Sequence, residues 1–290
     1  MNKLLCSSLL FTILVACSSA SKAQLVKCRV CDAKTGKGIP FSSIATRDAS
    51  KGCCSDIDGF FFADRKDTVK ISSIGYLTKH TAISSIAPND PRIIYLEETS
   101  IQVQELNIYG RKREKRSYIT LTSYKNKDSK GTSYNRPGVR YAVLMDNGMS
   151  KEGLIEKVTF KFEMEGDKKQ TANLRLRIYN VKTTSQKRPE DDLLFENVIV
   201  KPKNGWVTID VSKYNVPFPR NGVFVGVDWL ESNVMTTSTE RINPGICYYF
   251  GKGGATTLMS FRETGWRPDG FIGHIGPGSI ILKMKVSFNR

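Results

Sequence analysis

Histidine is nearly absent from this sequence: the 290 residues include two, His80 and His274. Most hydrolases and many metal sites need a histidine, or a pair of carboxylates, with partners that move protons or complete a coordination shell. His80 lies in the polar segment 79–81, and His274 lies in the glycine-rich segment 273–276. Neither has a second histidine at helical spacing, so both are expected to be surface or loop residues.

Motifs that mark common enzyme classes are also missing. The sequence has no Gly-x-Ser-x-Gly, no phosphate-binding loop ending in Gly-Lys-Ser or Gly-Lys-Thr, and no dinucleotide fingerprint after a strand. Asp56-x-Asp58-Gly59 resembles the start of a calcium loop but lacks the later acidic ligand, which favours a structural turn. Glu190-Asp-Asp192 follows a proline and indicates a polar loop rather than a calcium site. Neither a metal nor a cofactor is therefore expected.

No apolar run is long enough to cross a membrane as a helix. Leu4 to Val15 is apolar, but it is shorter than the roughly 20 residues that such a helix needs. Because it follows a positively charged start, residues 1–23 are predicted to be a secretory signal, which places the mature protein in the periplasm, the outer membrane or at the cell surface. Two processing routes stay open: lipidation at Cys17, which ends a lipobox-like sequence and would anchor the protein to the membrane, or cleavage after Ala23.

Acidic residues are outnumbered, since 28 aspartates and glutamates stand against 44 lysines and arginines, for a formal net charge of +16. This charge favours anionic partners, and export excludes nucleic acid from them. The run Arg111 to Arg116 has no apolar face. It is expected to be a solvated linker, residues 111–117, or a contact for anionic lipid or lipopolysaccharide phosphate. It separates a domain of residues 24–110 from a domain of residues 118–290.

Five cysteines follow the predicted signal: Cys28, Cys31, Cys53, Cys54 and Cys247. In an oxidising compartment they can form disulfides, or they can be buried free thiols. The first four could also be written as zinc ligands. However, adjacent residues of a strand point to opposite faces, so Cys53 and Cys54 cannot easily share a tetrahedral ion. The sequence disfavours zinc and leaves the cysteine pairing open.

The segment from Leu25 to Gly110 predicts a β-sandwich. Its apolar and polar residues alternate in short runs, and strands are expected over 25–31, 39–46, 60–63, 68–76, 78–83 and 92–96. Two turns separate the early strands. The first carries Gly36 and Gly38, where a hairpin can need positive φ, and the second has Gly59 in the left-handed position. These residues build structure and carry no chemistry.

The same segment carries a family resemblance. The residues concerned are Val30-x-Asp32-x-x-Thr35-Gly36, Ile39-Pro40, Asp56-x-x-Gly59-x-Phe61, Ile71-Ser-x-Ile74-Gly75-Tyr76, Leu96 and Glu105-Leu-x-Ile108-x-Gly110. They resemble the carboxypeptidase-regulatory-like domain, which implies a seven-stranded Greek-key sandwich that is an accessory and not a peptidase. That family occurs in envelope proteins of Gram-negative bacteria, including the front of TonB-dependent receptors. The residues after Gly110 are too few for a receptor barrel, and the cysteines at 28, 53 and 54 depart from the family pattern.

The chain from about Ser117 to Arg290 is also rich in predicted strands, with no helix of useful length and no internal repeat. Alternating or apolar runs predict strands over 155–164, 173–179, 206–211, 222–230, 247–250 and 279–288. The fold class expected for the whole protein is therefore all-β, with a jelly-roll-like β-sandwich as the second domain. This domain is loosely similar to the β-sandwich regions that follow the front domain in other envelope proteins.

Aromatic residues of the second domain are the remaining candidates for ligand binding. Flat rings can stack on the apolar faces of sugars while neighbouring polar groups bind the hydroxyls. The candidate residues are Trp229, Trp266, Tyr248, Tyr249, Asp228 and Arg267. Strand alternation sends Tyr248 and Tyr249 to opposite faces, so at least one ring is expected to be exposed. Trp266, in a loop with Gly265 and Pro268, is the first choice, and the competing interpretation is that these rings belong to the core.

The sequence therefore predicts a non-enzymatic, exported, two-domain protein that binds a glycan or another envelope protein through loops of the second domain. One alternative is a glycan-active hydrolase with a carboxylate pair beside Trp229 or Trp266. Another is a structural subunit of a surface assembly, in which a free edge at strand 279–288 pairs with a neighbour. A tight cluster of ionisable side chains in a closed pocket of the C-terminal half would argue against binding alone.

Overall fold

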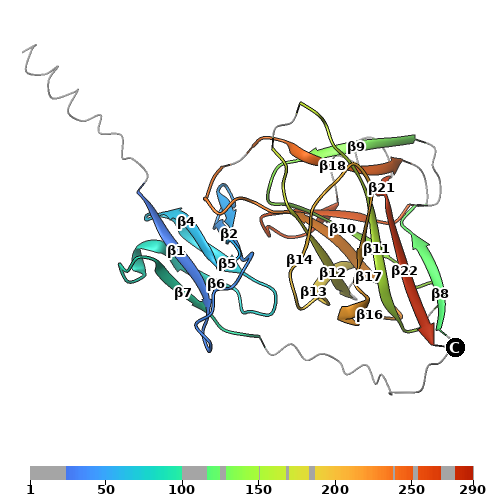
Figure 1. Ribbon diagram of the computed structural model, residues 1–290, viewed down its shortest axis with the longest axis horizontal. Coiled ribbons are helices and arrows are strands. Elements are labelled where there is room, and N and C mark those ends of the chain that lie inside the picture. The colour runs from blue at the N-terminus through green and yellow to red at the C-terminus, as the bar shows by residue number, and fades with distance from the viewer. Residues whose placement is uncertain are drawn as a thin grey trace, which may run out of the picture.

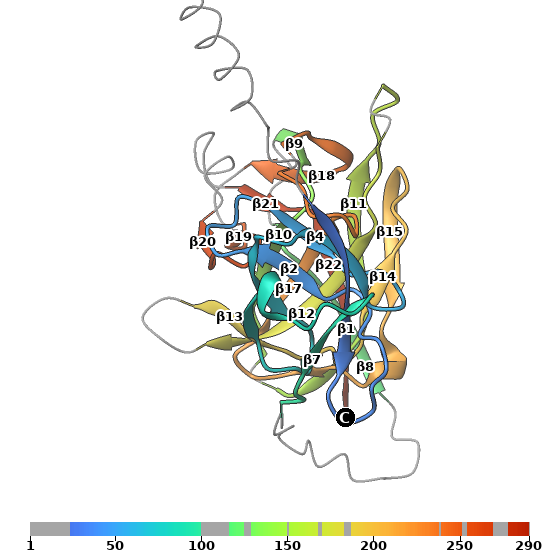
Figure 2. The same ribbon diagram turned by 90° about the vertical axis from the view of Figure 1, so that its left-hand side faces the viewer.

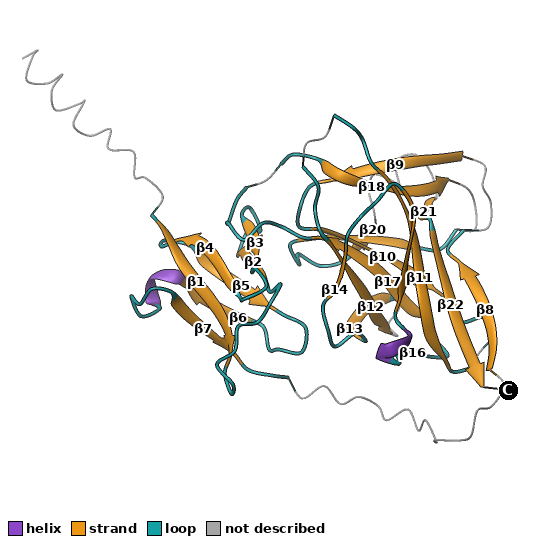
Figure 3. Cartoon of the chain, viewed as in Figure 1, coloured by secondary structure: helices purple, strands orange, loops and turns teal. Residues whose placement is uncertain are grey.

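A computed structural model describes residues 24–99, 116–124, 129–149, 151–167, 170–182, 187–237, 239–250, 254–268 and 278–289. The predicted signal with Cys17, the basic run up to residue 115, and His274 lie outside the described residues. Figure 1 shows two groups of strands side by side, and Figure 3 shows that strands dominate both. The helical segments of the described residues are two 3-10 turns, η1 (Ile83–Ser85) and η2 (Ser212–Tyr214). No helix among the described residues is long and apolar enough to cross a membrane.

The first domain consists of two packed sheets. One has the order β4-β1-β7 and the other the order β3-β2-β5-β6. The strands are β1 (Leu25–Asp32), β2 (Ser43–Thr46), β3 (Gly52–Cys54), β4 (Phe60–Asp64), β5 (Thr68–Ser72), β6 (Lys79–Ala82) and β7 (Arg92–Leu96). Buried apolar side chains such as Val30, Phe61 and Ile71 fill the space between the sheets. The predicted β-sandwich is confirmed here, and β3 contains the adjacent pair Cys53 and Cys54.

Two aspartate turns fix the loops of this sandwich, and in the first Asp32 Oδ1 accepts a hydrogen bond from the backbone N–H of Thr35 at 2.6 Å. Asp56 Oδ1 accepts hydrogen bonds from the backbone N–H of Asp58 at 3.0 Å and of Phe60 at 2.8 Å, with Gly59 at φ +86°. This is the structural turn that the sequence predicted. Gly36 has the expected positive φ of +70°. Gly38 does not, and it is needed for another reason: a Cβ there would lie 2.0 Å from the Asp58 carbonyl oxygen.

The second domain is a larger pair of sheets packed face to face. One sheet has the order β13-β12-β17-β10-β19-β20, with β14 beside β12; the other has the order β21-β18-β11-β22-β8, with β15 and β16 beside β11 and β9 beside β18. Their bounds are β8 (Arg116–Thr122), β9 (Ser129–Asn135), β10 (Val139–Met145), β11 (Gly153–Glu163), β12 (Leu174–Lys182), β13 (Arg188–Asp192), β14 (Val198–Val200), β15 (Gly205–Asp210), β16 (Pro217–Phe218), β17 (Val223–Trp229), β18 (Ile242–Phe250), β19 (Thr257–Phe261), β20 (Arg267–Pro268), β21 (Gly278–Ile280) and β22 (Leu282–Asn289). The all-β class is confirmed.

Several strands of this domain differ from those that the sequence predicted. β10 is buried along almost its whole length, so it shows no alternation of apolar and polar residues. The expected loop at Glu190-Asp-Asp192 is instead the end of β13, which pairs with β12. The expected single strand over 279–288 is two, β21 and β22, and β22 pairs with β11 on one side and with β8 on the other. Its edge is therefore occupied, and it offers no free edge to a neighbouring subunit.

A segment of the second domain completes the first domain. Residues 232–236 run antiparallel to β3 at Gly52 and parallel to β4 at Phe62. Gly52 and Thr236 exchange two backbone hydrogen bonds of 3.0 Å, and Phe62 N–H donates to the Asn233 carbonyl at 2.8 Å. Because β3 and β4 are edge strands of the two different sheets, this segment closes the open side of the sandwich. Met235 inserts its side chain into the first-domain core and is 7% exposed.

Buried arginines of the second domain also bind the first. Arg262 donates to the Ala49 carbonyl at 2.9 Å and pairs with Glu231 at 2.8 Å. Arg175 donates to the Phe41 carbonyl at 2.7 Å. Figure 2 views the molecule from the side of the first domain, with its strands in front of the second. These contacts fix the two domains relative to each other and create the walls of the cleft described next.

Candidate functional site

Two of the aromatic rings predicted to bind ligand are core residues instead. Trp229 is 1% exposed, lies edge-on to Tyr141 with ring centroids 5.8 Å apart, and donates its indole N–H to the Pro244 carbonyl at 2.9 Å. Tyr248 is 3% exposed and packs against Phe250. The other sheet of the second domain covers one face of β17, and the first domain lies over the face that carries Asp228, so every residue of the strand is buried and alternation along it exposes no ring. Trp229 and Tyr248 therefore cannot act as surface stacking rings.

The other predicted residues lie in different places. Tyr249 is half-buried against Tyr124, with ring centroids 4.9 Å apart. Arg267 is exposed in β20 and lines a cleft of about 550 Å³ on the second domain. Trp266 is half-buried, edge-on to Tyr179 at 5.5 Å between centroids. The predicted set is thus dispersed, and Trp266 is the one whose ring lines the cleft between the domains.

That interdomain cleft has a volume of about 610 Å³. One wall comes from the first domain, including Ser72 and Tyr76, and the other comes from the second domain, including Arg177, Asp192 and Trp266. This volume lies within the usual range for ligand pockets, about 300–1,000 Å³. It is large enough for a small oligosaccharide or for several side chains of a peptide. Its lining is mostly polar, so hydrogen bonds rather than apolar contacts would orient a ligand.

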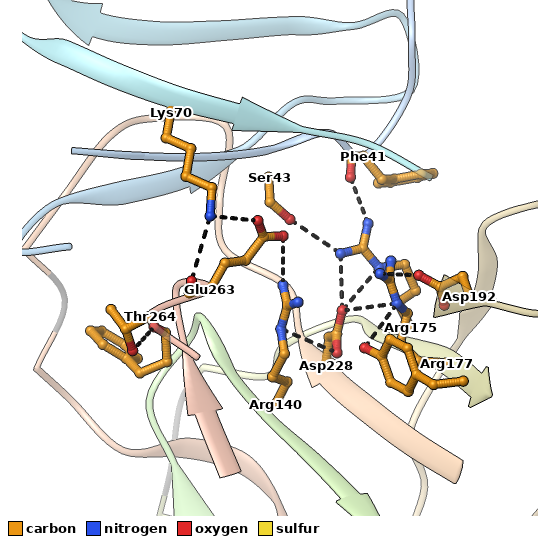
Figure 4. Close-up of polar contacts among 12 residues, drawn as sticks. Phe41, Ser43, Lys70, Arg140, Arg175, Arg177, Asp192, Asp228, Glu263 and Thr264 are labelled. Carbon is orange, nitrogen blue, oxygen red and sulfur yellow. Dashed lines mark hydrogen bonds and ion pairs between the residues drawn. The ribbon is translucent and has the colours of Figure 1, made fainter. Parts of the chain in front are cut away.

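A buried charge network forms the floor of the cleft, and Asp228 is its centre (Figure 4). Arg175 donates to Asp228 Oδ2 from Nη2 at 2.9 Å and from Nε at 3.1 Å. Arg140 Nε lies 3.7 Å from Oδ1, and Arg177 Nε lies 4.0 Å from Oδ2. Burial alone would raise the pKa of Asp228, but the attraction of the three arginines outweighs it, so the pKa is lowered. Asp228 is therefore charged and held by three cations.

Two further carboxylates in the network have opposite pKa shifts. Glu263 lies 3.1 Å from Arg140 and 3.5 Å from Lys70 of the first domain. Its burial opposes ionisation, yet Arg140 above all lowers its pKa to about 2. Asp192 accepts a hydrogen bond from Arg177, but burial raises its pKa to about 6. Asp192 Oδ1 is buried and has no hydrogen-bond partner among the described residues, which favours a proton there.

The network is close to electrically neutral as a whole. Four cations, Arg140, Arg175, Arg177 and Lys70, face three carboxylates, Asp192, Asp228 and Glu263. Burying charges is tolerable only when partners and hydrogen bonds compensate the lost hydration. Arg175 satisfies this fully, because its guanidinium also donates to Phe41 O and to the Asn197 and Ser43 side chains. The cluster thus supports the domain interface as well as lining the cleft.

Asp192 gives the site a pH dependence that can be measured. Its pKa is raised in the folded state, so its contribution to stability is present below pH 4 and is lost as pH rises through about 6. Relative to wild type, the Asp192→Asn variant is expected to gain on the order of 2–3 kcal/mol in unfolding free energy between about pH 4 and pH 7. Urea denaturation at several pH values measures this. Asp146→Asn, at an exposed pair with Lys187, serves as the control, and parallel wild-type and Asp192→Asn profiles would contradict the assignment.

The five cysteines that the structure describes are free and buried. Cys53 and Cys54 do point to opposite faces: Cys53 belongs to the first-domain core, whereas Cys54 faces Arg175 and Asp228 across the domain interface. Burial raises the pKa of Cys54 to about 12 and that of Cys53 well above its usual range, so both are unreactive thiols. No group of three or more possible metal ligands occurs among the described residues. His80 is exposed in β6, an edge strand, as expected.

Sequence reasoning missed the arginines of the floor. In β12 the pattern Leu174-Arg-Leu-Arg177 looks like a strand with its arginines in water, yet Arg175 and Arg177 are 2% and 8% exposed. The first domain covers that face of the sheet. The one indication in the sequence is Asp228, an acidic residue inside the apolar run 223–229, since such a residue needs buried cationic partners.

Comparisons with known proteins add little to this geometry. No protein-family model and no curated protein sequence matches the chain. Among solved structures, infectious bursal disease virus chains align with 91% of this chain at a TM-score of 0.23: the Gx strain at 9% identity over 55% of its chain, the Gt strain at 10% over 62%, and the T13 viral particle at 12% over 61%. This chain spans only 55 to 62% of the length of those viral chains. A similarity this low carries no argument about function.

Proposed function

We propose that this protein is an exported, non-enzymatic envelope protein that binds a glycan, or a glycan-bearing envelope protein, in the cleft between its two domains. The signal-like segment 1–23 supports export, with the lipid anchor at Cys17 and signal cleavage after Ala23 as the two processing routes. The packed sheets and aspartate turns of the first domain support its assignment to the carboxypeptidase-regulatory-like family, whose members are accessory modules.

The observation that carries the proposal is the position of Trp266 in the interdomain cleft. Its half-buried ring shares the cleft with Tyr76, with the exposed acids Glu190 and Asp191, and with Arg177. A ring offers a stacking surface to the C–H face of a sugar, and carboxylates and guanidinium groups exchange hydrogen bonds with its hydroxyls. These are the groups that orient a neutral, polar ligand. Because the domains are fixed to each other, the cleft is preformed.

The pairing of the floor carboxylates favours binding over catalysis. Asp228 is held by Arg175, and Glu263 is held by Arg140 and Lys70. A nucleophile or general base must be free to meet the substrate at hydrogen-bond distance, whereas Asp228 is 4% exposed with Oδ2 accepting from Arg175, and Glu263 Oε1 accepts from Arg140. The buried cluster of ionisable side chains, which the sequence did not predict, therefore serves mainly to join the two domains.

A glycan-active hydrolase is the second candidate, and one observation favours it. Asp192, with its pKa raised to about 6, and Glu263, with its pKa lowered to about 2, line the same cleft as Trp266. Divergent pKa values in one site are the pattern of a general acid beside an ionised carboxylate. Release of reducing sugar that is lost in both Asp192→Asn and Glu263→Gln would support the hydrolase.

The binding proposal is tested by screening the mature protein on a glycan array and then titrating the strongest neutral ligand into variants. Trp266→Ala is expected to weaken binding by roughly tenfold to a hundredfold, on the scale of the about 1–3 kcal/mol that loss of a ring stacked on a nucleobase costs. Phe195→Ala, at an aromatic residue 48% exposed and outside the cleft, is the matched control. Unchanged affinity in Trp266→Ala, or equal losses in both variants, would exclude the cleft as the site.

A further inference from the structure

The outer face of the sheet that contains β8, β22, β11 and β15 carries an ordered set of lysines. Val158, Phe160 and Met284 of these strands point into the core, so the alternate residues point outward. Thr159 lies opposite Lys283, and Lys157 lies opposite Lys285. The outward residues of these four strands form what we call the lysine face: Trp206, Thr208, Asp210, Glu156, Lys157, Thr159, Lys161, Glu163, Lys283, Lys285, Ser287, Arg116, Tyr118, Thr120 and Thr122.

Aromatic rings lie beneath three of the ammonium groups. Lys283 Nζ is 4.1 Å and Lys161 Nζ is 5.5 Å from the centre of the Trp206 ring, and Lys285 Nζ is 4.5 Å from that of Tyr118. Cation–π contacts of this length hold a lysine over a ring. Trp206 and Tyr118 are 39% and 53% exposed. The face therefore presents cations at fixed positions rather than on freely moving side chains.

The charges of the lysine face are not balanced within the face. Lys157 and Lys285 are direct cross-strand neighbours, an arrangement of like charges that destabilises a sheet. Lys157 pairs with Asp210 at 3.2 Å, Arg116 pairs with Glu156 at 3.5 Å, and Glu163 accepts a hydrogen bond from Thr132. Among the ion pairs of the described residues, none includes Lys161, Lys283 or Lys285. Three neighbouring cations thus attract a ligand with repeated negative charge.

The side chains around the cations select among such ligands. Thr159 and Thr208 share a hydrogen bond of 3.0 Å between their hydroxyls, and Thr120 and Thr122 continue the polar surface onto β8. The face therefore places hydroxyl groups beside its cations. Its rings lie under ammonium groups rather than protruding, which does not suit insertion among lipid chains.

We propose that the lysine face is a second binding site, separate from the interdomain cleft, and that it takes a linear acidic polysaccharide. Carboxylates or sulfates repeated along the polymer would bind Lys161, Lys283 and Lys285, while the sugar hydroxyls bind the threonines. Binding by charge also predicts a steep dependence on salt, because exposed charges are screened within about 8 Å at physiological ionic strength.

The test uses the mature chain, polygalacturonate as the acidic probe and dextran as the neutral one. In affinity electrophoresis at about 50 mM salt, polygalacturonate is expected to retard the wild type and dextran is not. The variant K161Q/K283Q/K285Q is expected to lose roughly tenfold or more in affinity. The matched variant K37Q/K151Q/K201Q removes three exposed lysines outside the four strands and is expected to bind as the wild type does, with circular dichroism confirming that both are folded.

Three results would overturn the proposal. The first is no retardation of wild type by polygalacturonate, and the second is an equal loss in both lysine variants, which would indicate net charge alone. The third is binding to vesicles of anionic phospholipid that K161Q/K283Q/K285Q abolishes while polygalacturonate binding persists. The neutral-glycan titration of Trp266→Ala is unaffected by any of these, so failure here and failure of the cleft can be told apart.

Discussion

Replacing Asp228 with alanine is expected to lower the free energy of unfolding by about 3–5 kcal/mol. The carboxylate is 4% exposed and lies among Arg140, Arg175 and Arg177. Removing it leaves three buried guanidinium groups whose mutual repulsion has no central anion, and the interior cannot supply the hydration that they lose. The loss is a large part of the 5–15 kcal/mol by which most proteins are stable.

Chemical denaturation of the Asp228→Ala variant at pH 7 measures this loss. Asp228→Asn keeps the shape but not the charge, so it is expected to be destabilised as well, and by less if the amide still accepts from Arg175. Asp146→Ala removes an exposed partner of Lys187 and is expected to change stability little, as the loss of an exposed ion pair usually does. An Asp228→Ala protein as stable as Asp146→Ala would show that the network is not held by its central charge.

The same network also predicts how the free energy of unfolding changes as pH falls. The folded-state pKa values of Asp228 and Glu263 are both lowered, that of Glu263 to about 2. Their stabilising contributions are therefore complete above pH 5 and are lost as pH falls through the folded-state values. The pKa of Asp192 is raised instead, so its contribution to stability is lost as pH rises. Wild type should consequently show its stability maximum near the pH at which Asp192 is still partly protonated while Asp228 and Glu263 are charged.

The sequence predicts the parts of this fold that depend on local patterns. Alternation along 155–163 and the aspartate turn at 56–59 appear in the structure where they were expected, because strand periodicity and turn geometry are set by neighbouring residues. Trp229 shows where prediction from strand alternation fails. It lies in a strand buried on both faces, and a strand of that kind has no alternation from which the direction of a ring can be read.

The candidate site was less predictable than the fold, because it is made by contact between the domains. Cys54 illustrates the reason. Its direction, opposite to Cys53, follows from the strand, but its burial follows from the second domain covering β3. Arg175 similarly appears solvent-directed until Phe41 and Ser43 of the first domain are placed beside it. Contacts between residues more than a hundred positions apart leave no periodic trace in one sequence.

The segment 232–236 leads to the second large expected effect. Residues 24–99 expressed alone are expected to be much less stable than in the full chain and to aggregate. Two edge strands, β3 and β4, lose their backbone partners, and unpaired edges promote association between molecules. The core also loses Met235, which is 7% exposed; removal of a buried methionine side chain alone costs about 2–5 kcal/mol.

Complementation in trans makes this prediction specific. A synthetic peptide of residues 230–237 is expected to raise the melting temperature of the 24–99 fragment. The same peptide with Met235→Ser is expected to raise it far less. Both peptides keep the backbone hydrogen bonds, but only the first places a methionine side chain in the core. In the full chain, Met235→Ala should destabilise the protein, while Met149→Ala, at a methionine 44% exposed, should not. The contradicting result is a fragment that melts at the temperature of the full chain and whose melting temperature does not change when the peptide is added. It would mean that the first domain is complete without the second. The segment 232–236 would then not fix the cleft between the domains.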